Sequence, residues 1–271
     1  MPLLLAAPLV VFMLAFYALP VVTMLMRSVS DPMWTVSNYA ALAGDAVFLK
    51  TFSNTFYTSL IVTLGTLLMG YPVALALVRA PRWAPLILIL ILLPFWTSVL
   101  VRSYAWMVLM GRHGLINEAL LAAGLLERPL RILNTPLATQ IAMVHILLPY
   151  MILPIANALR QIDPSLARAA SGLGATPWKT FRQVILPVSM PGVAAGVLLV
   201  FVLALGFYIT PAMVGGPRDI TLSMLIAQQV DQLNWSYAAC LSAVLLATAL
   251  VIIGVFHRLP GIGNAFRMNT R

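Results

Sequence analysis

Long apolar runs separated by short polar segments dominate the chain. Six of these runs are long enough to cross a bilayer, because about 20 apolar residues in a helix span its hydrocarbon core. They cover residues 2–25, 56–78, 84–110, 137–159, 190–214 and 237–256. The pattern predicts an all-α integral membrane protein with six transmembrane helices. The first run is expected to be a retained helix, because no Lys or Arg precedes it and it is longer than the core of a secretory signal.

Composition supports a membrane protein and excludes a soluble domain. Hydrophobic residues make up 62% of the 271 residues and charged residues 8%, and the mean hydropathy is +0.99. The net charge of +9 comes from Lys and Arg residues scattered singly at the ends of apolar runs, so we expect no nucleic-acid partner. Cys240 is the only cysteine, which excludes an internal disulfide and a cysteine metal cluster.

The distribution of Lys and Arg predicts the orientation. Six crossings place both termini on one side, and basic residues are enriched in cytoplasmic loops. The side that carries the termini holds nine of them: Arg79, Arg82, Arg160, Arg168, Lys179, Arg182, Arg258, Arg267 and Arg271. The other side holds six, or seven if Arg102 is counted: Arg27, Lys50, Arg112, Arg128, Arg131, Arg218 and Arg102. We therefore expect cytoplasmic termini and a cytoplasmic segment 160–187.

The polar segment 160–187 contains two helix starts. The dipeptides D-P at 163–164 and T-P at 176–177 each place an N-cap residue before a proline in the first helical turn. Gly172 and Gly174 lie between the two starts and allow the chain to reverse direction. The segment therefore predicts a hairpin of two short helices outside the membrane.

The second of these helices is amphipathic. Trp178, Phe181 and Ile185 recur at helical spacing on one face, and charged and amide side chains occupy the other. Pro187 is expected to end this helix before the fifth span. Such a hairpin fits either a groove on a partner protein or the surface of the lipid bilayer.

A nucleotide site in this hairpin is excluded by its spacing. The stretch G-L-G-A-T-P-W-K-T at 172–180 has Leu173 and Trp178 where a phosphate-binding loop needs glycines. Any ATP must therefore be bound by a different chain. We expect no catalytic residue and no metal site, because His145 has no second histidine or acid at helical spacing and no Ser-His-Asp set is evident.

The hairpin resembles the E-A-A-x3-G-x9-I-x-L-P loop of ABC importer permeases, with the spacing intact. The matching residues are Arg168, Ala169, Ala170, Gly174 and Pro187. The resemblance implies a type I ABC importer permease fold with cytoplasmic coupling helices, in which these five residues couple the chain to an ATPase. Arg168 replaces the glutamate of the motif, which reverses one charge at the expected interface.

Three further stretches are similar to the spermidine/putrescine (PotB/PotH-like) permease group: residues 93–106, 111–121 and 208–217. The similarity implies a bacterial inner-membrane protein whose partners are a second homologous permease, two ATP-binding subunits and a periplasmic solute-binding protein. It places ATP and Mg on the partner ATPase and no cofactor in this chain. The expected cargo is a polyamine, with an opine, γ-aminobutyrate, a phosphonate or another amino-acid-like compound as alternatives.

The same resemblance suggests a division of the chain into three parts. Residues 1–50 would hold the first transmembrane helix and a periplasmic segment. Residues 51–257 would form the type I core of five helices, including the loop at 160–187. Residues 258–271 would form a cytoplasmic tail. Two other function classes, an intramembrane enzyme and a stand-alone channel, remain as alternatives to a permease.

Aromatic side chains are candidates for a translocation pathway, because the six runs contain no carboxylate to compensate a cationic cargo and aromatic faces attract cations. The candidates, with one nearby arginine, are Trp96, Arg102, Tyr104, Trp106, Phe207 and Tyr208. The aromatics equally fit ordinary packing or an interfacial belt. Arg102 fits extension to the interface, pairing with an acid in a loop, or contact with an anionic group of an amino-acid-like cargo.

Overall fold

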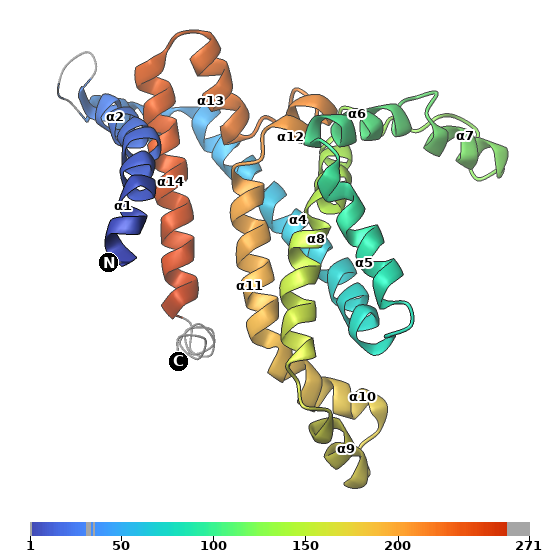
Figure 1. The fold of residues 1–271 in the computed structure, drawn as a ribbon. Helices are drawn as coiled ribbons and strands as arrows, with labels where there is room; N and C mark the ends of the chain where they lie inside the picture. The colour runs from blue at the N-terminus through green and yellow to red at the C-terminus, as the bar shows by residue number, and fades with distance from the viewer. Residues whose placement is uncertain (1, 31–33, 35, 259–271) are drawn as a thin grey trace.

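The computed structural model describes residues 2–30, 34 and 36–258. Residues 259–271 of the predicted tail lie outside the described residues. Every regular element of the described part is helical, so the predicted all-α class is confirmed. Figure 1 shows the short helices α9 and α10 at the same end of the molecule as the end of α14, with α7, α12 and α13 at the opposite end.

Five helical segments are long and apolar enough to cross a membrane. They are formed by the following elements: α1 (Pro2–Met13, from Pro8 on), η1 (Leu14–Ala18) and α2 (Leu19–Ser30); α4 (Ala46–Arg79); α8 (Pro136–Arg160); α10 (Pro177–Thr180), η3 (Phe181–Ile185) and α11 (Leu186–Leu205); and α14 (Trp235–Arg258). A sixth crossing is formed if the bent pair 84–96 and 99–109 is one span, which agrees with the six predicted.

Shorter helices connect these segments at the two ends of the bundle (Figure 1). They are α3 (Ser37–Gly44), α7 (Leu115–Ala122), α9 (Pro164–Gly172), α12 (Ile209–Val214) and α13 (Leu222–Asp231). The predicted fifth span, 190–214, is wrong at its end, because α11 stops at Leu205 and α12 is a separate helix. Gly206 lies at the end of α11, where it interrupts the helix.

The predicted third span is also not one straight helix. It consists of α5 (Ala84–Leu92), the 3-10 turn η2 (Leu93–Trp96) and α6 (Val99–Leu109), and the two halves are bent by 101°. Thr97 is extended, and its hydroxyl donates to the Pro94 carbonyl at 2.9 Å. Ser98 caps the new helix by accepting from the Leu100 N–H at 3.3 Å. The L-P-F-W stretch therefore changes the direction of the chain within the run 84–110, which the apolar pattern predicted to be one span.

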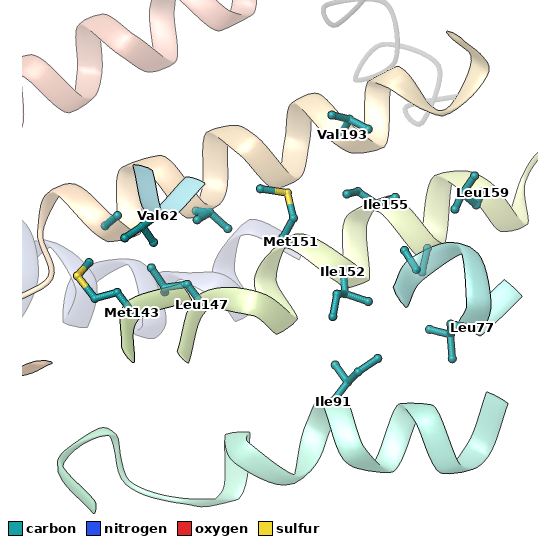
Figure 2. Packing of buried hydrophobic residues seen from close by; sticks show 14 residues of the cluster. Val62, Leu77, Ile91, Met143, Leu147, Met151, Ile152, Ile155, Leu159 and Val193 are labelled. Atoms are coloured by element: carbon teal, nitrogen blue, oxygen red, sulfur yellow. The ribbon is translucent and has the colours of Figure 1, made fainter. Parts of the chain in front are cut away.

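The core lies where α4, α8 and α11 pack together (Figure 1). Figure 2 shows side chains from α4, α5, α8 and α11 meeting in one apolar cluster, with Met151 and Ile155 fully buried. Helices α8 and α11 approach each other closely at Gly192 and Gly196. A Cβ at Gly192 would overlap the Cβ of Ala158, so α8 and α11 are in contact at this position.

The expected end of the second hairpin helix at Pro187 is wrong. α10, η3 and α11 form one continuous segment, Pro177–Leu205. The Leu186 N–H donates to the Phe181 carbonyl five residues back, in a π-helical turn that is wider than an α-helical one. This turn accommodates Pro187 without a break, so the hairpin helix and the fifth span are a single helix.

The first and last spans stand beside the core as a second packing unit, in which α2 lies along α14 (Figure 1). One end of this unit is joined to the rest of the chain by two hydrogen bonds. Ser28 Oγ and the Tyr39 hydroxyl are 2.7 Å apart, and the Tyr237 hydroxyl donates to Asp45 Oδ2 at 2.5 Å. The second bond joins the start of α14 to the N-cap of α4.

This junction is expected to depend on pH. The Tyr237 hydroxyl and the Val47 N–H hold the pKa of Asp45 below its ordinary value. A lowered folded-state pKa gives stability that is complete above the unfolded value of about 4 and is lost as the pH falls below it. We expect the unfolding temperature in detergent to fall more steeply below about pH 4 in the wild type than in Asp45→Asn.

Tyr237→Phe provides the matched control, because it removes one of these bonds and keeps the one from Val47. Its expected cost at neutral pH is about 1 kcal/mol, and its pH dependence should lie between those of the wild type and Asp45→Asn. Superimposable curves for all three proteins would contradict a role for Asp45 at the junction.

Candidate functional site

The hairpin formed by α9 and α10 is built on two side-chain caps, as predicted. Asp163 Oδ1 accepts from the Ser165 N–H at 2.8 Å, and Thr176 Oγ1 accepts from the Lys179 N–H at 3.4 Å. The backbone and side-chain hydrogen bonds of Ser165 hold the pKa of Asp163 below its ordinary value. Asp163 is therefore a charged cap at the positive end of α9 at neutral pH.

The reversal between the two helices depends on Gly174. Its φ is +79°, a conformation that costs L-residues about 1–2 kcal/mol. Gly172 has no positive φ and ends α9, so only one of the two predicted glycines makes the turn. The Gly174 N–H donates to the Ser171 carbonyl at 3.0 Å and closes the end of α9.

The end of the hairpin is a surface on which both apolar and charged side chains are exposed. Leu173 is 90% exposed and Trp178 is 69% exposed, although both are large apolar side chains. Arg168 and Ala169 are also exposed, and Ala170 is partly buried. The surface has apolar anchors beside a positive charge, which is a composition suited to contact with a protein.

The base of the hairpin is anchored to the core through Tyr71, a residue that the sequence analysis did not single out. The Phe181 ring stacks on Trp178 at 5.6 Å and meets the Tyr71 ring edge-on at 5.8 Å. The Tyr71 hydroxyl lies 2.8 Å from Ser189 Oγ, which donates to the Leu186 carbonyl. Tyr71 of α4 therefore holds the junction of the hairpin and α11.

The six predicted pathway residues do not form one cluster. Phe207 packs against the central core, and Trp106 packs against a separate cluster around Met110. Trp96 lies at the bend of the third span and is 89% exposed. Tyr104 and Tyr208 are 55% and 45% exposed.

Trp106 contacts His145, which is 39 residues further along the chain. Its Nε1 donates to His145 Nδ1 at 3.2 Å, and the two rings meet edge-on at 5.5 Å. His145 is therefore held by a polar contact as well as by apolar packing. Within the described residues, no group of three or more His, Cys, Asp or Glu side chains could hold a metal ion.

A buried hydrogen bond fixes α6 against α12 and predicts an asymmetric effect of two substitutions. Ser103 Oγ donates to the Val99 carbonyl at 2.9 Å, so Thr210 donates to Ser103 Oγ at 2.7 Å. Both side chains are fully buried.

Ser103→Ala leaves the Thr210 hydroxyl unpaired and is expected to cost about 2 kcal/mol of folding stability. Thr210→Val leaves Ser103 its carbonyl partner and is expected to cost less than about 1 kcal/mol, measured by unfolding of the purified proteins. Equal costs would contradict this assignment of the donor.

Comparison with known proteins places the chain in a transporter family. The model of the "binding-protein-dependent transport system inner membrane component" family matches residues 1–258. The chain is 36% identical over 245 residues to the spermidine/putrescine transport system permease protein PotB of Haemophilus influenzae, covering 90% of this chain and 81% of that protein.

Solved structures support the same fold. A bacterial ABC transporter that imports the acidic polysaccharide alginate matches with a TM-score of 0.76 at 18% identity, over 95% of this chain and 96% of that one. The alginate transporter in complex with its pentasaccharide-bound periplasmic protein also matches, with a TM-score of 0.76 at 18% identity, over 93% of this chain and 91% of that one. The chain belongs to the family of inner membrane components of binding-protein-dependent transport systems, as a permease subunit of an ABC importer.

Proposed function

We propose that the chain moves a polyamine of the spermidine and putrescine class inward across the bacterial inner membrane by alternating access. The observation that carries this proposal is the 36% identity to a permease named for these cargoes, over most of both chains. The aromatic faces of Trp96, Tyr104 and Tyr208 are exposed in the single chain and are available for cation–π contacts along the pathway.

In this proposal the hairpin couples transport to ATP hydrolysis on a separate subunit. Arg168, Ala169, Ala170 and Gly174 lie on the hairpin, and Pro187 lies where it joins α11. Support comes from the exposed apolar side chains at the tip and from the continuous helix that joins it to the fifth span. ATP and Mg would be bound by two partner subunits.

The complete transporter would contain a second homologous permease, the two ATP-binding subunits and a periplasmic solute-binding protein. The relative solved with its periplasmic protein supports the last of these partners. The hairpin would face the cytoplasm together with both termini. Figure 1 supports a common side for the hairpin and the described end of α14.

The test is ATP turnover by the complete complex reconstituted in lipid with its binding protein. Spermidine or putrescine should stimulate hydrolysis, and γ-aminobutyrate, an opine and a phosphonate should leave it at the basal rate. If γ-aminobutyrate, an opine or a phosphonate stimulated ATP hydrolysis and neither polyamine did, the cargo would belong to the class of that compound. The proposed coupling would be contradicted if no cargo changed the rate of ATP hydrolysis and uptake proceeded without ATP.

A further inference from the structure

Two adjoining cavities lie at the end of the bundle opposite the hairpin. The larger, of about 700 Å³, lies between the segment that leads into α8 and the segment that joins α12 to α13, and Arg131 and Arg218 line it. The smaller, of about 330 Å³, lies against the start of α4, and Lys50 and Arg218 line it. The two cavities share Arg218 and are named here the basic cavities.

Helix α8 separates the basic cavities from the hairpin. Pro136 lines the larger cavity and is the first residue of α8, whose last residue, Arg160, leads into the hairpin. A helix of 25 residues is about 37 Å long, which is enough to cross the bilayer. With the hairpin in the cytoplasm, the basic cavities therefore face the periplasm.

The backbone around the larger cavity is held by contacts between its segments. The Asn134 N–H donates to the Val214 carbonyl at 3.1 Å, and a Cβ at Gly216 would overlap the Asn134 carbonyl oxygen. The Asn54 side-chain amide donates to the Arg218 carbonyl at 3.0 Å and joins the same segment to α4. A backbone that is already fixed in this way loses little conformational freedom when a partner binds.

The basic cavities carry an excess of positive charge. Arg131, Arg218 and Lys50 line them, and Asp219 is the one acidic residue among their lining residues. Asp219 Oδ2 accepts from the Gly216 N–H at 3.2 Å, and within the described part of the chain neither arginine forms an ion pair. Both arginines are exposed, so their guanidinium groups are available to an anionic group from outside the chain.

This positive charge is unusual for its location. Basic residues are depleted from the outer loops of membrane proteins, yet three of the six that the sequence predicts for the outer side line these two cavities. The charge excludes the proposed polyamine as the occupant, because the cargo is itself cationic. The cavities are concave, which fits protruding side chains of a folded protein better than a flat lipid surface.

We propose that the basic cavities receive acidic side chains of the periplasmic solute-binding protein, and that this attraction steers the binding protein onto the permease. Opposite charges on two protein surfaces raise their association rate and fix their relative orientation. The inference rests on the proposed function, because that function supplies both a periplasmic binding protein and a cationic cargo.

The test measures binding of the solute-binding protein to the complete transporter in nanodiscs of neutral lipid. Arg131→Gln combined with Arg218→Gln should weaken binding about five- to tenfold at low salt, mainly through slower association. The difference from the wild type should largely disappear in about 0.5 M salt, which screens exposed charges. Arg131→Lys combined with Arg218→Lys keeps both charges and should stay within about twofold of the wild type.

Arg112→Gln combined with Arg128→Gln is the matched control. Both arginines are exposed, both are predicted for the outer side, and neither lines the basic cavities. This variant loses the same net charge and should bind within about twofold of the wild type. Equal weakening in the two Gln variants would assign the effect to net charge and contradict the inference.

Charge exchange identifies the acidic side chains. Arg218→Glu should weaken binding more than Arg218→Gln, because it places like charges opposite each other. Replacement of one surface Asp or Glu of the binding protein by Arg should then restore the affinity, which a merely structural role of Arg218 would not produce. Assembly of each variant is checked by copurification of all subunits.

The possible outcomes separate this inference from the proposed function. If the wild type binds the solute-binding protein and the variant with Gln at 131 and 218 binds it equally well, the inference is wrong and the proposed function stands. If that variant differs from the wild type only in nanodiscs of anionic lipid, the cavities bind lipid phosphates and the inference is wrong. If no binding protein associates with the wild type, the proposed function fails as well. Weaker binding that charge exchange restores supports the inference.

Discussion

Gly174→Val is expected to reduce ATP-driven uptake more than tenfold while leaving membrane insertion unchanged. The φ of +79° at this position is strained for any L-residue, and a β-branched side chain adds to the strain. No atom lies within 4 Å of a Cβ built there, so the effect comes from the backbone of the turn and not from crowding. A displaced turn moves α9 relative to α10 and disrupts the surface that we propose contacts the ATP-binding subunit.

Gly172→Val is the matched control for this experiment. It lies two residues away in the same hairpin, has open space around its Cβ position and has no positive φ. The measurements are uptake in proteoliposomes, copurification of the ATP-binding subunit and the amount of inserted protein. Equal loss with both variants would show that the hairpin tolerates no added side chain at its tip and that the turn geometry is not the cause.

Gly192→Leu is expected to destabilise the protein by about 3 kcal/mol and to reduce the yield of folded permease. Even the first added atom would overlap the Cβ of Ala158 and would lie 2.7 Å from the Pro154 carbonyl oxygen. Accommodation requires α8 and α11 to separate, which opens a closely packed contact of the core. Thermal unfolding in detergent measures the effect.

Gly254→Leu provides the comparison, because it introduces the same side chain into another membrane-spanning helix. No atom lies within 4 Å of its Cβ position on α14. We expect an unfolding temperature within a few degrees of the wild type. A similar loss in both variants would attribute the effect to leucine in a membrane helix and not to the α8–α11 contact.

Features determined by local sequence could be predicted, because their physical cause lies within a few residues. The caps at Asp163 and Thr176 and the turn at Gly174 follow from the hydrogen-bonding and backbone preferences of those residues. The apolar runs likewise predicted the spans, since a bilayer demands their length and composition.

Features that depend on contacts between distant residues could not be predicted. The Trp106–His145 hydrogen bond joins positions 39 residues apart, and the Tyr71–Ser189 contact joins positions 118 residues apart. Pro187 was misinterpreted because a proline usually ends a helix, and no local signal marks the π-helical turn that accommodates it. The bend at Thr97 was missed because apolar periodicity reports burial and carries no information on direction.

The unbroken helix from Pro177 to Leu205 has a mechanical consequence. Tyr71 contacts this helix at Ser189, close to its middle. At 1.5 Å per residue, the helix extends about 18 Å from Ser189 towards the hairpin and about 24 Å in the other direction. A rotation of 10° about that point moves the two ends by about 3 and 4 Å in opposite directions. A single rigid tilt of this helix would thus narrow the pathway at one end and widen it at the other, without unwinding any helical turn.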